Sequence, residues 1–331
     1  MTMMTTLSFI SPQERPAPVF SSIHGIVPVM ITPFTPGDRI DWAGYEALIE
    51  WYLANGSEAL FAVCQSAEMQ ALSLEERRDL ARFTVEHVAG RVPVVASGHI
   101  SETMDEQKAE LLAMADTGVD GVVLVTNRLA GPQEDSATLR DRLDALLAAL
   151  PTGLPLGLYE CPSPYRRLLT DDEISWCAET GRFAFLKDVS CDMGTIERRL
   201  ALTRGMPLAI NNANAAIAWP ALQAGAKGFC GVMNNFHPDL YRWLQDHGEA
   251  HPSLAEDLAT FLALAAQCEP MGYPKLAKLF HCRLGTFRHA GSRTVPFDIH
   301  ERFWALDAIL DRIEQGTRNF RERIALLKEA A

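Results

Sequence analysis

The sequence lacks the features that would place the protein in a membrane or on a nucleic acid. It has no apolar run near the ~20 residues that a helix needs to cross a bilayer, although 48% of its 331 residues are hydrophobic. It has no excess of basic residues either, since 30 lysines and arginines stand against 42 aspartates and glutamates, for a net charge of −12. We therefore expect neither nucleic acid nor an anionic membrane as the partner. A small acidic substrate is not excluded, because a local basic pocket fits inside an acidic protein.

Paired cysteines are absent as well. The seven cysteines are odd in number and none stands in a C-x-x-C pair, a pattern that disfavours a disulfide framework. Residues 1–20 lack the basic start and the continuous apolar stretch of a secretory signal. These features predict a protein with free thiols in the reducing cytoplasm. The Pro, Ser and Thr content of residues 1–22 predicts a loose N-terminal arm.

What the sequence does have is an alternation of short apolar runs and helical stretches. The eight runs are Gly25–Thr32, Ala59–Gln65, Val92–Ser97, Gly121–Thr126, Leu154–Tyr159, Phe183–Asp188, Pro207–Asn211 and Gly228–Val232. They are apolar throughout, as is typical of parallel strands covered on both faces. Eight strands and eight helices in strict order predict an α/β fold, a (β/α)8 TIM barrel over residues 23–251. A doubly wound sheet is the competing fold, but it predicts a G-x-G-x-x-G turn, which the sequence lacks.

Helix signals stand between the strands and continue after them. Three S/T-x-x-E patterns, which typically precede helices, are Ser73 with Glu76, Thr103 with Glu106, and Thr170 with Glu173. After about residue 252 the β pattern stops. The helices predicted there are Leu254–Gln267, Tyr273–Leu284 and Ile299–Leu327, the last interrupted near Gly316. Because no flexible linker precedes them, we expect residues 252–331 to form a C-terminal helical extension packed on the barrel.

Polar residues follow four of the predicted strands, at the end of the barrel where TIM-barrel active sites lie. They are Gln65 and Ser66, Tyr159 and Glu160, Lys187 and Asp188, and Asn211 and Asn212. The nine histidines form no H-x-H or H-E-x-x-H pattern and no cluster with carboxylates at strand ends, so we expect no catalytic metal. The pair Gly228 and Gly231 on the last strand is consistent with a phosphate site, but tight packing is the favoured role, because that segment offers only one lysine.

Lys187 is the sharpest candidate among these residues. It follows the apolar residues Phe183 to Leu186, and a water-poor surrounding favours the neutral amine that attacks a ketone. The alternative is a lysine whose stem passes apolar neighbours to put its ammonium in solvent. Tyr159 ends the run LPLGLY, and its phenol is suited to proton transfer, although a structural tyrosine at the barrel rim is equally consistent. The hydroxyl of Ser66 and the neighbouring backbone N–H groups are suited to a carboxylate, although loop serines are more often structural.

These strand-end residues, in this order, resemble the dihydrodipicolinate synthase and N-acetylneuraminate lyase family of class I aldolases. The resemblance extends roughly from Ile23 to Leu284 and is carried by GIVPVMITPF, by LYECP, which is similar to a family Tyr-Asn-x-Pro, by FLKD, and by ALQAGAKG. It implies that Lys187 forms the Schiff base, that Tyr159 moves protons, and that Ser66 binds the carboxylate of a 2-oxo acid. It also implies a homo-oligomer, a tetramer or a dimer, that needs no organic cofactor and no catalytic metal.

The sequence also departs from the family pattern. The family loop Gly-Thr-Thr-Gly-Glu is Cys-Gln-Ser-Ala-Glu at residues 64–68, and Gln65 cannot relay a proton as a hydroxyl does. Leu129 stands in the segment where the synthase has a second relay tyrosine, and Pro164 stands where it has an arginine for the substrate carboxylate, with Arg166 and Arg167 slightly later. The segment 211–215 lacks the glutamate that sialic acid lyases offer to the sugar chain.

We therefore predict a lyase, an aldolase or dehydratase that acts on a small 2-oxo acid such as pyruvate. Lys187 and Tyr159 are the expected catalytic residues, and the expected substrate-binding residues are Ser66, Gln65, Asn212, Cys230 and Arg166. Aldol cleavage and dehydration share an intermediate, so the sequence leaves both open. Two alternatives stand beside this hypothesis. One is a catalytically silent barrel that binds a 2-oxo acid as a sensor or partner subunit, and the other is metal-assisted aldol chemistry, which the missing ligand cluster disfavours.

Overall fold

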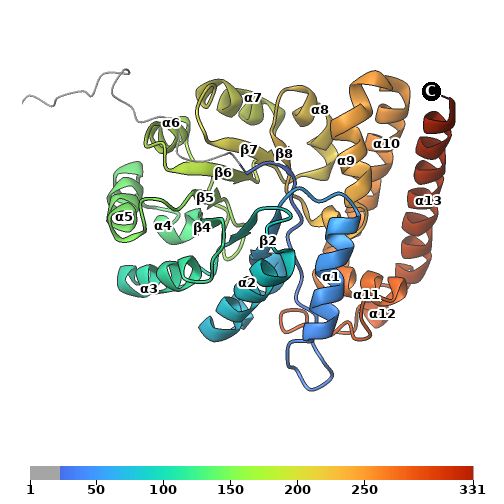
Figure 1. The fold of residues 1–331 in the computed structure, drawn as a ribbon, viewed down its shortest axis with the longest axis horizontal. Coiled ribbons are helices and arrows are strands. Elements are labelled where there is room, and N and C mark those ends of the chain that lie inside the picture. Colours follow the sequence, from blue (N-terminus) through green and yellow to red (C-terminus); the bar gives the residue numbers. More distant parts are fainter. Residues whose placement is uncertain (1–22, 331) are drawn as a thin grey trace, which may run out of the picture.

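Eight short parallel strands surround the core of the computed structural model, which describes residues 23–330 (Figure 1). The strands are β1 (Gly25–Ile26), β2 (Leu60–Val63), β3 (Val94–Ala96), β4 (Gly121–Val125), β5 (Leu156–Tyr159), β6 (Phe183–Asp188), β7 (Ala209–Asn212) and β8 (Gly228–Phe229). Every residue in them is buried. This burial on both faces explains why the strands read as continuous apolar runs in the sequence. The predicted N-terminal arm, residues 1–22, lies outside the described residues.

The sheet closes into a barrel through the chain that follows β1. The hydrogen-bonded order is β1-β8-β7-β6-β5-β4-β3-β2, and Val29 forms a parallel bridge with Phe61 of β2. On this seam the Met30 N–H donates to the Phe61 carbonyl, and the Phe61 N–H donates to the Pro28 carbonyl, both at 3.0 Å. The structure is thus the predicted (β/α)8 barrel. The run predicted as one strand, Gly25–Thr32, is divided because Pro28 has no N–H to donate to a ladder.

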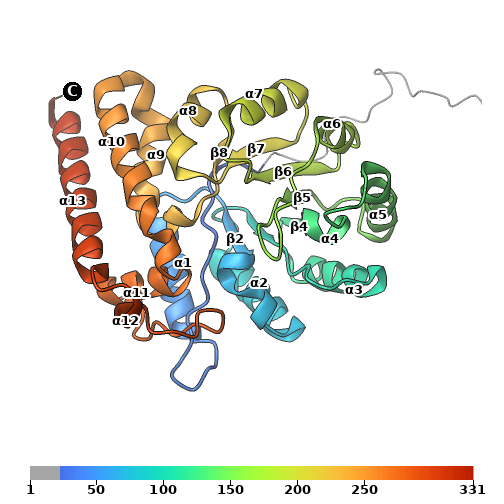
Figure 2. The same ribbon diagram turned by 180° about the vertical axis from the view of Figure 1, so that it is seen from behind.

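Helices surround the sheet in Figure 1 and Figure 2. They are α1 (Trp42–Ala54), α2 (Leu74–Val88), α3 (Met104–Ala115), α4 (Thr126–Leu129), α5 (Ser136–Ala149), α6 (Asp171–Glu179), α7 (Met193–Leu202), α8 (Ala218–Gln223), α9 (Pro238–His247), α10 (Pro252–Ala265), α11 (Lys275–Leu284), α12 (Ile299–Arg302) and α13 (Leu306–Ala330). Short 3₁₀ turns lie between them, of which η2 (Gln65–Ala67) and η7 (Ala266–Met271) contribute to the site. The sequence signals at the helix starts are confirmed: Ser73 caps α2 and Thr170 caps α6, each in a full capping box.

The C-terminal helices pack along one side of the barrel, with α13 beside α10 at the edge of the molecule (Figure 2). The predicted interruption near Gly316 is wrong, because α13 runs through that residue without a break. A Cβ at position 316 would lie 2.2 Å from the Phe261 ring of α10, so the glycine permits close packing of the two helices. The break lies earlier, between α12 and α13, where Phe303 leaves the helical conformation.

The barrel wall also depends on close backbone contacts. A Cβ at Gly228 would lie 2.1 Å from the Gly25 carbonyl oxygen, and one at Gly157 would lie 3.0 Å from the Phe185 ring. Glycine at these positions lets β1 approach β8 and lets the side chains of neighbouring strands fill the barrel. The tight-packing interpretation of Gly228 agrees with this geometry.

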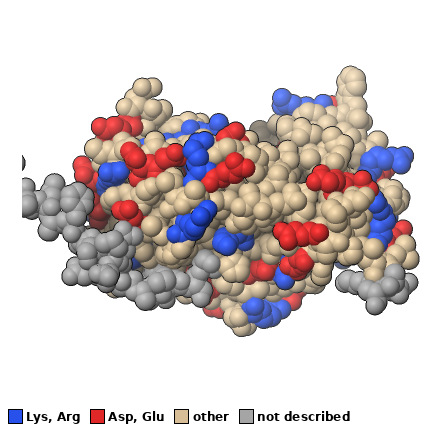
Figure 3. Space-filling model, turned by 90° about the horizontal axis from the view of Figure 1, so that it is seen from above, with Lys and Arg blue, Asp and Glu red and all other residues tan. Residues whose placement is uncertain are grey.

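None of the described helices is long and apolar enough to cross a membrane. On the face shown in Figure 3, the described acidic and basic side chains are interspersed and form no broad area of one sign. A strongly basic surface, which nucleic-acid binding typically requires, is not seen on that face.

Buried neutral histidines predict a loss of stability in acid. Nδ1 of His99 accepts from the Val125 N–H at 3.0 Å and Nε2 donates to Gln107 Oε1 at 2.6 Å. Burial lowers the pKa of His99 from 6.5 to about 4. As the pH falls from 6.5 towards 4, the unfolded chain therefore gains a proton that the folded chain does not, and the free energy of unfolding decreases. At about 1.4 kcal/mol per pKa unit, the decrease in the free energy of unfolding due to His99 is about 3 kcal/mol.

Denaturant unfolding at neutral and acidic pH measures this loss. His99→Gln should weaken the pH dependence between about pH 6.5 and 4, while the same change at the exposed His24 should leave it as in the wild type. An unaltered pH dependence in H99Q would contradict the assignment.

Candidate active site

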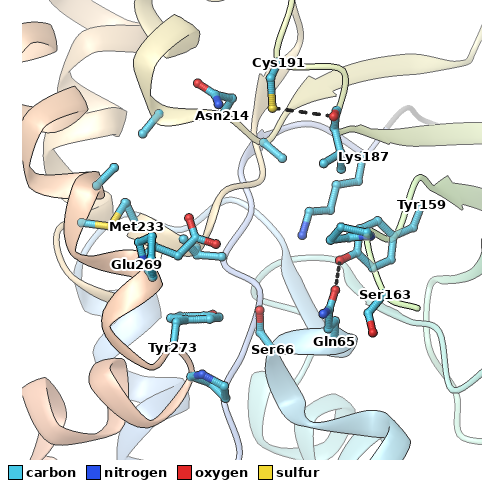
Figure 4. A pocket seen from close by; sticks show the side chains of 18 of the residues that line it. Gln65, Ser66, Tyr159, Ser163, Lys187, Cys191, Asn214, Met233, Glu269 and Tyr273 are labelled. Carbon is cyan, nitrogen blue, oxygen red and sulfur yellow. Dashed lines mark hydrogen bonds between the residues drawn. The ribbon is translucent and has the colours of Figure 1, made fainter. Parts of the chain in front are cut away.

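A cavity of about 730 Å3 lies where the carboxyl ends of the strands meet the C-terminal helices (Figure 4). The side chains from the barrel that line it include Gln65, Ser66, Tyr159, Ser163, Lys187, Asn214 and Phe229. Those from the C-terminal segments include Gln267, Glu269, Tyr273, Thr294 and Val295. The cavity occupies the position in which TIM barrels carry their active sites.

Lys187 extends from β6 into this cavity. All six residues of β6 are buried, and Lys187 itself is 4% exposed. Its Nζ lies 4.4 Å from the centroid of the Tyr159 ring, and Lys187 and Tyr159 are paired in register on adjacent strands. Lys187 takes part in none of the ion pairs between described residues. The amine is thus presented to the cavity without a carboxylate partner, as a nucleophilic amine requires.

Neutral thiols surround the amine. Cys64, Cys161 and Cys230 are fully buried. Burial raises the pKa of each thiol, to about 12 for Cys230, although the positive charge of Lys187 acts in the opposite direction. At neutral pH these cysteines are therefore uncharged, and they contribute small, weakly polar walls rather than thiolate nucleophiles.

Tyr159 is held in place by a side chain from η2, the turn that follows β2. Its hydroxyl donates to Gln65 Oε1 at 3.3 Å (Figure 4). The thiol of Cys161 donates to the same oxygen at 3.3 Å. Burial, followed by the neighbouring thiols, raises the pKa of Tyr159 well above its ordinary value of 10.0. The phenol therefore stays protonated near neutral pH. The amide oxygen of Gln65 accepts a hydrogen bond from this hydroxyl but does not take up its proton. Gln65 therefore orients Tyr159 and does not extend a proton relay.

The loop that carries Gln65 and Ser66 is fixed from the C-terminal helices. Glu68, which ends η2 at φ 64°, forms a fully buried ion pair with Lys278 of α11. It also accepts from the Thr294 N–H at 2.8 Å and the Ser292 hydroxyl at 2.7 Å. Burial lowers the pKa of Lys278 to about 8, although Glu68 acts in the opposite direction. These contacts tie the loop to segments more than 200 residues away in the sequence.

A second buried cluster fixes the ends of β5 and β6. Arg199 of α7 bridges Glu160 and Asp188, the residues that directly follow Tyr159 and Lys187. The three side chains are at most 1% exposed. Glu160 also accepts from the Leu169 N–H at 2.7 Å and from the Val189 N–H at 3.1 Å. Two carboxylates share one guanidinium, and burial raises the pKa of Glu160 above its ordinary value.

The structure brings together Lys187, Tyr159, Gln65 and Ser66, whereas three other predicted site residues do not line the cavity. Asn212 is buried and its side chain holds the backbone of Asn214, which does line the cavity. Cys230 is buried, and the charge of Lys187 acts on its thiol. Arg166 is exposed and donates to the Val189 and Ser190 carbonyls. Its neighbour Arg167 forms an ion pair with Glu173.

Sequence reasoning did not identify the lining residues that come from the C-terminal segments. Glu269 of η7 points into the cavity opposite Lys187 (Figure 4). The surrounding protein raises its pKa, while Lys187 acts to lower it. Tyr273 lies beside Ser66, and its hydroxyl accepts from Asn235 Nδ2 at 3.1 Å. The helical pattern beyond residue 252 predicts packing but contains no signal that these side chains face the site.

No metal centre is formed by the described residues, among which no group of three or more His, Cys, Asp or Glu side chains could hold an ion. An amine and a protonated phenol face a common space, and imine formation with proton transfer uses these two groups.

The sequence is similar to that of proteins in one known family. The model of the dihydrodipicolinate synthetase family matches residues 22–269. The chain is 30% identical over 207 residues to a 4-hydroxy-tetrahydrodipicolinate synthase of Bacillus subtilis, covering 62% of this chain and 69% of that protein. It is 25% identical over 273 residues to a protein of the same name from Methanospirillum hungatei, covering 80% of this chain and 92% of that protein.

Solved structures share the fold. A dihydrodipicolinate synthase of Bacillus anthracis superimposes with a TM-score of 0.80 at 22% identity, covering 88% of this chain and 99% of that one. A chloride-inhibited dihydrodipicolinate synthase of Acinetobacter baumannii, solved in complex with pyruvate, has a TM-score of 0.78 at 22% identity, covering 88% and 99%.

Proposed function

The chain belongs to the dihydrodipicolinate synthetase family, and from this premise we propose that it is a class I lyase that binds a small 2-oxo acid such as pyruvate as a Schiff base on Lys187. The observation that carries the proposal is the buried Lys187 amine, which has no ion-pair partner among the described residues and faces the cavity beside Tyr159. The family implies carbon–carbon or carbon–oxygen bond chemistry, and both fit the same site.

The proposed reaction begins with attack of the Lys187 amine on the ketone carbon of the 2-oxo acid. The carbinolamine that forms loses its hydroxyl as water when Tyr159 delivers a proton, which leaves a protonated imine. The imine withdraws electrons and stabilises an enamine, which forms either by carbon–carbon cleavage or by loss of a proton from the carbon beside the imine. After cleavage, the enamine takes up a proton at carbon. In dehydration, the enamine instead expels a β-hydroxyl as water and becomes an unsaturated imine. In both cases water then releases the 2-oxo acid and restores the amine.

The carboxylate of the 2-oxo acid is assigned to the loop of residues 65–67. Ser66 is 5% exposed and lines the cavity beside Tyr273. A hydroxyl in a largely desolvated position forms a strong hydrogen bond with a carboxylate. The ion pair of Glu68 with Lys278 holds this loop in place.

Borohydride reduction in the presence of pyruvate tests the proposal directly. The intact mass should increase by one reduced pyruvyl group, and peptide mapping should place it on Lys187. Absence of any adduct with a panel of 2-oxo acids would contradict the proposed function. An adduct without turnover of any substrate would instead point to the silent binding protein considered from the sequence.

Tyr159→Phe should lower kcat by about 10²-fold or more, because proton delivery to the carbinolamine loses its donor. The fold should be retained, since only the hydrogen bond to Gln65 is removed. Tyr165→Phe is the matched control, because the Tyr165 hydroxyl donates to the Asn127 carbonyl and does not line the cavity. Steady-state kinetics and circular dichroism measure both effects. Wild-type turnover by Y159F would make Tyr159 a packing residue.

The protein is also proposed to be a homo-oligomer, a tetramer or a dimer, that works in the cytoplasm. Membership in the family supports the oligomer, and seven free cysteines are typical of a reducing compartment. Light scattering coupled to gel filtration measures the assembly.

A further inference from the structure

Two ionisable side chains of opposite sign face each other across the cavity. Lys187 enters from β6 and Glu269 enters from η7, on the far wall (Figure 4). They are the two formally charged residues among the described residues that line the cavity. Lys187 is also the charge that acts on the Glu269 carboxyl. A substrate held by Lys187 therefore lies in a cavity that Glu269 also faces.

The arginines nearest to the site are engaged elsewhere. Arg166 donates to the carbonyls of Val189 and Ser190. Arg167 is paired with Glu173, whose side chain is fully buried. No guanidinium lines the cavity among the residues that the structure describes. A second carboxylate at the far end of a substrate would thus have no fixed cation to bind it.

The charge balance of the site with the 2-oxo acid bound also disfavours a carboxylate at the far end of the substrate. Once the imine has formed, the protonated imine nitrogen and the carboxylate of the 2-oxo acid offset each other. The charge that remains in the cavity is that of Glu269. An anionic chain end beside this carboxylate is repelled.

The neutral polar side chains of the cavity suit hydroxyl groups. Gln70, Asn214, Gln267 and Thr294 line the cavity. The amide and hydroxyl groups of these side chains both donate and accept hydrogen bonds. They therefore match a substrate hydroxyl, which also does both, better than an ammonium group, which only donates. The cavity, at about 730 Å3, also has the size of sites that hold ligands much larger than a three-carbon acid.

We propose that the part of the substrate beyond the 2-oxo acid is an uncharged, hydroxylated chain, and that Glu269 binds its hydroxyl groups. This inference rests on the proposed function, since Lys187 must first hold the 2-oxo acid. In the direction of synthesis, the enamine carbon of bound pyruvate attacks the aldehyde carbon of such a chain, and the aldehyde oxygen takes up a proton and becomes a hydroxyl. Aldehydes that end in a carboxylate, aspartate semialdehyde included, are poor partners.

The experiment has two stages, so that its failure is separate from failure of the proposed function. Borohydride trapping with pyruvate first establishes that the Schiff base forms. Condensation of pyruvate is then measured by mass spectrometry with glyceraldehyde and erythrose, with propanal, with succinic and aspartate semialdehydes, and with 3-aminopropanal. The hydroxylated aldehydes should exceed each of the others by about tenfold or more in kcat/KM, the scale of a lost charge-assisted hydrogen bond.

Variants of Glu269 identify the residue responsible. Glu269→Gln should reduce the preference for hydroxylated over carboxylated aldehydes by about tenfold, mainly through KM, with pyruvate trapping unchanged. Glu269→Lys should favour the semialdehydes. The matched control is Glu249→Gln, an exposed glutamate that does not line the cavity, and it should behave as the wild type.

Several outcomes would overturn the inference. Preference of the wild type for a semialdehyde or for 3-aminopropanal would do so, as would an unchanged preference in E269Q. Trapping of pyruvate without condensation of any hydroxylated aldehyde would also overturn it while leaving the Schiff base in place. If borohydride trapped no pyruvate adduct, the proposed function would be contradicted, and this inference, which rests on it, would fail as well.

Discussion

Lys187→Arg should abolish borohydride trapping of pyruvate. A guanidinium stays protonated and cannot form an imine, and no other lysine lines the cavity among the described residues. The substitution keeps the positive charge and much of the length of the side chain, so that the barrel wall is disturbed little. Intact-mass measurement after reduction gives the result for the whole protein, and turnover should be lost together with the adduct.

Lys227→Arg is the control for this experiment. Lys227 is exposed and lies just before β8, outside the cavity, and its replacement should leave trapping at the wild-type level. A Schiff base that forms undiminished in K187R would show that another amine is the nucleophile.

Arg199→Met should lower the free energy of unfolding by about 3–5 kcal/mol, the scale found when one partner of a buried ion pair is removed. Arg199 is 1% exposed and neutralises Glu160 and Asp188, which are fully buried. Without the guanidinium, both carboxyl groups would have to be protonated or hydrated for the chain to stay folded. Because Glu160 and Asp188 follow Tyr159 and Lys187 directly, we also expect the activity that remains to fall.

Arg198→Met provides a matched control one residue away. Arg198 is paired with Asp171, but both side chains are about half exposed, and such surface pairs contribute about 1 kcal/mol or less. Denaturant unfolding of the two variants gives the comparison. Equal losses in R198M and R199M would show that the buried cluster does not stabilise this end of the barrel.

The barrel could be predicted from the sequence because its signal is local. A strand that is covered on both faces needs apolar residues at every position, and such runs are visible one segment at a time, as in Phe183–Leu186. A residue that ends such a run in a barrel lies at the active-site end. For that reason Lys187, Tyr159, Gln65 and Ser66 could be placed near one another before the structure, and they do line one cavity.

The side-chain partners of the strand ends could not be predicted in this way. Arg166 follows strand β5 at a position that favours a role above the pocket, but it turns to the Val189 and Ser190 carbonyls. Asn212 ends β7, yet its amide is used to shape the turn before Asn214. The position of each side chain depends on which backbone N–H and C=O groups of a neighbouring loop have no other hydrogen-bond partner. These groups are fixed only when the loops come together in the folded protein.

The sequence by itself determined the order of the strands and helices, the burial of the strands, and the positions of the amine and the phenol at strand ends, because periodicity and strand position are properties of one segment. The tertiary structure alone decided that Glu269 and Tyr273 face Lys187 and Ser66 and that Glu68 pairs with Lys278. These contacts join segments about 80 to 210 residues apart. The hydrophobic pattern of a helix does not indicate which residues its polar face contacts. Packing of the C-terminal helices against the open end of the barrel therefore completes the site that the strands begin.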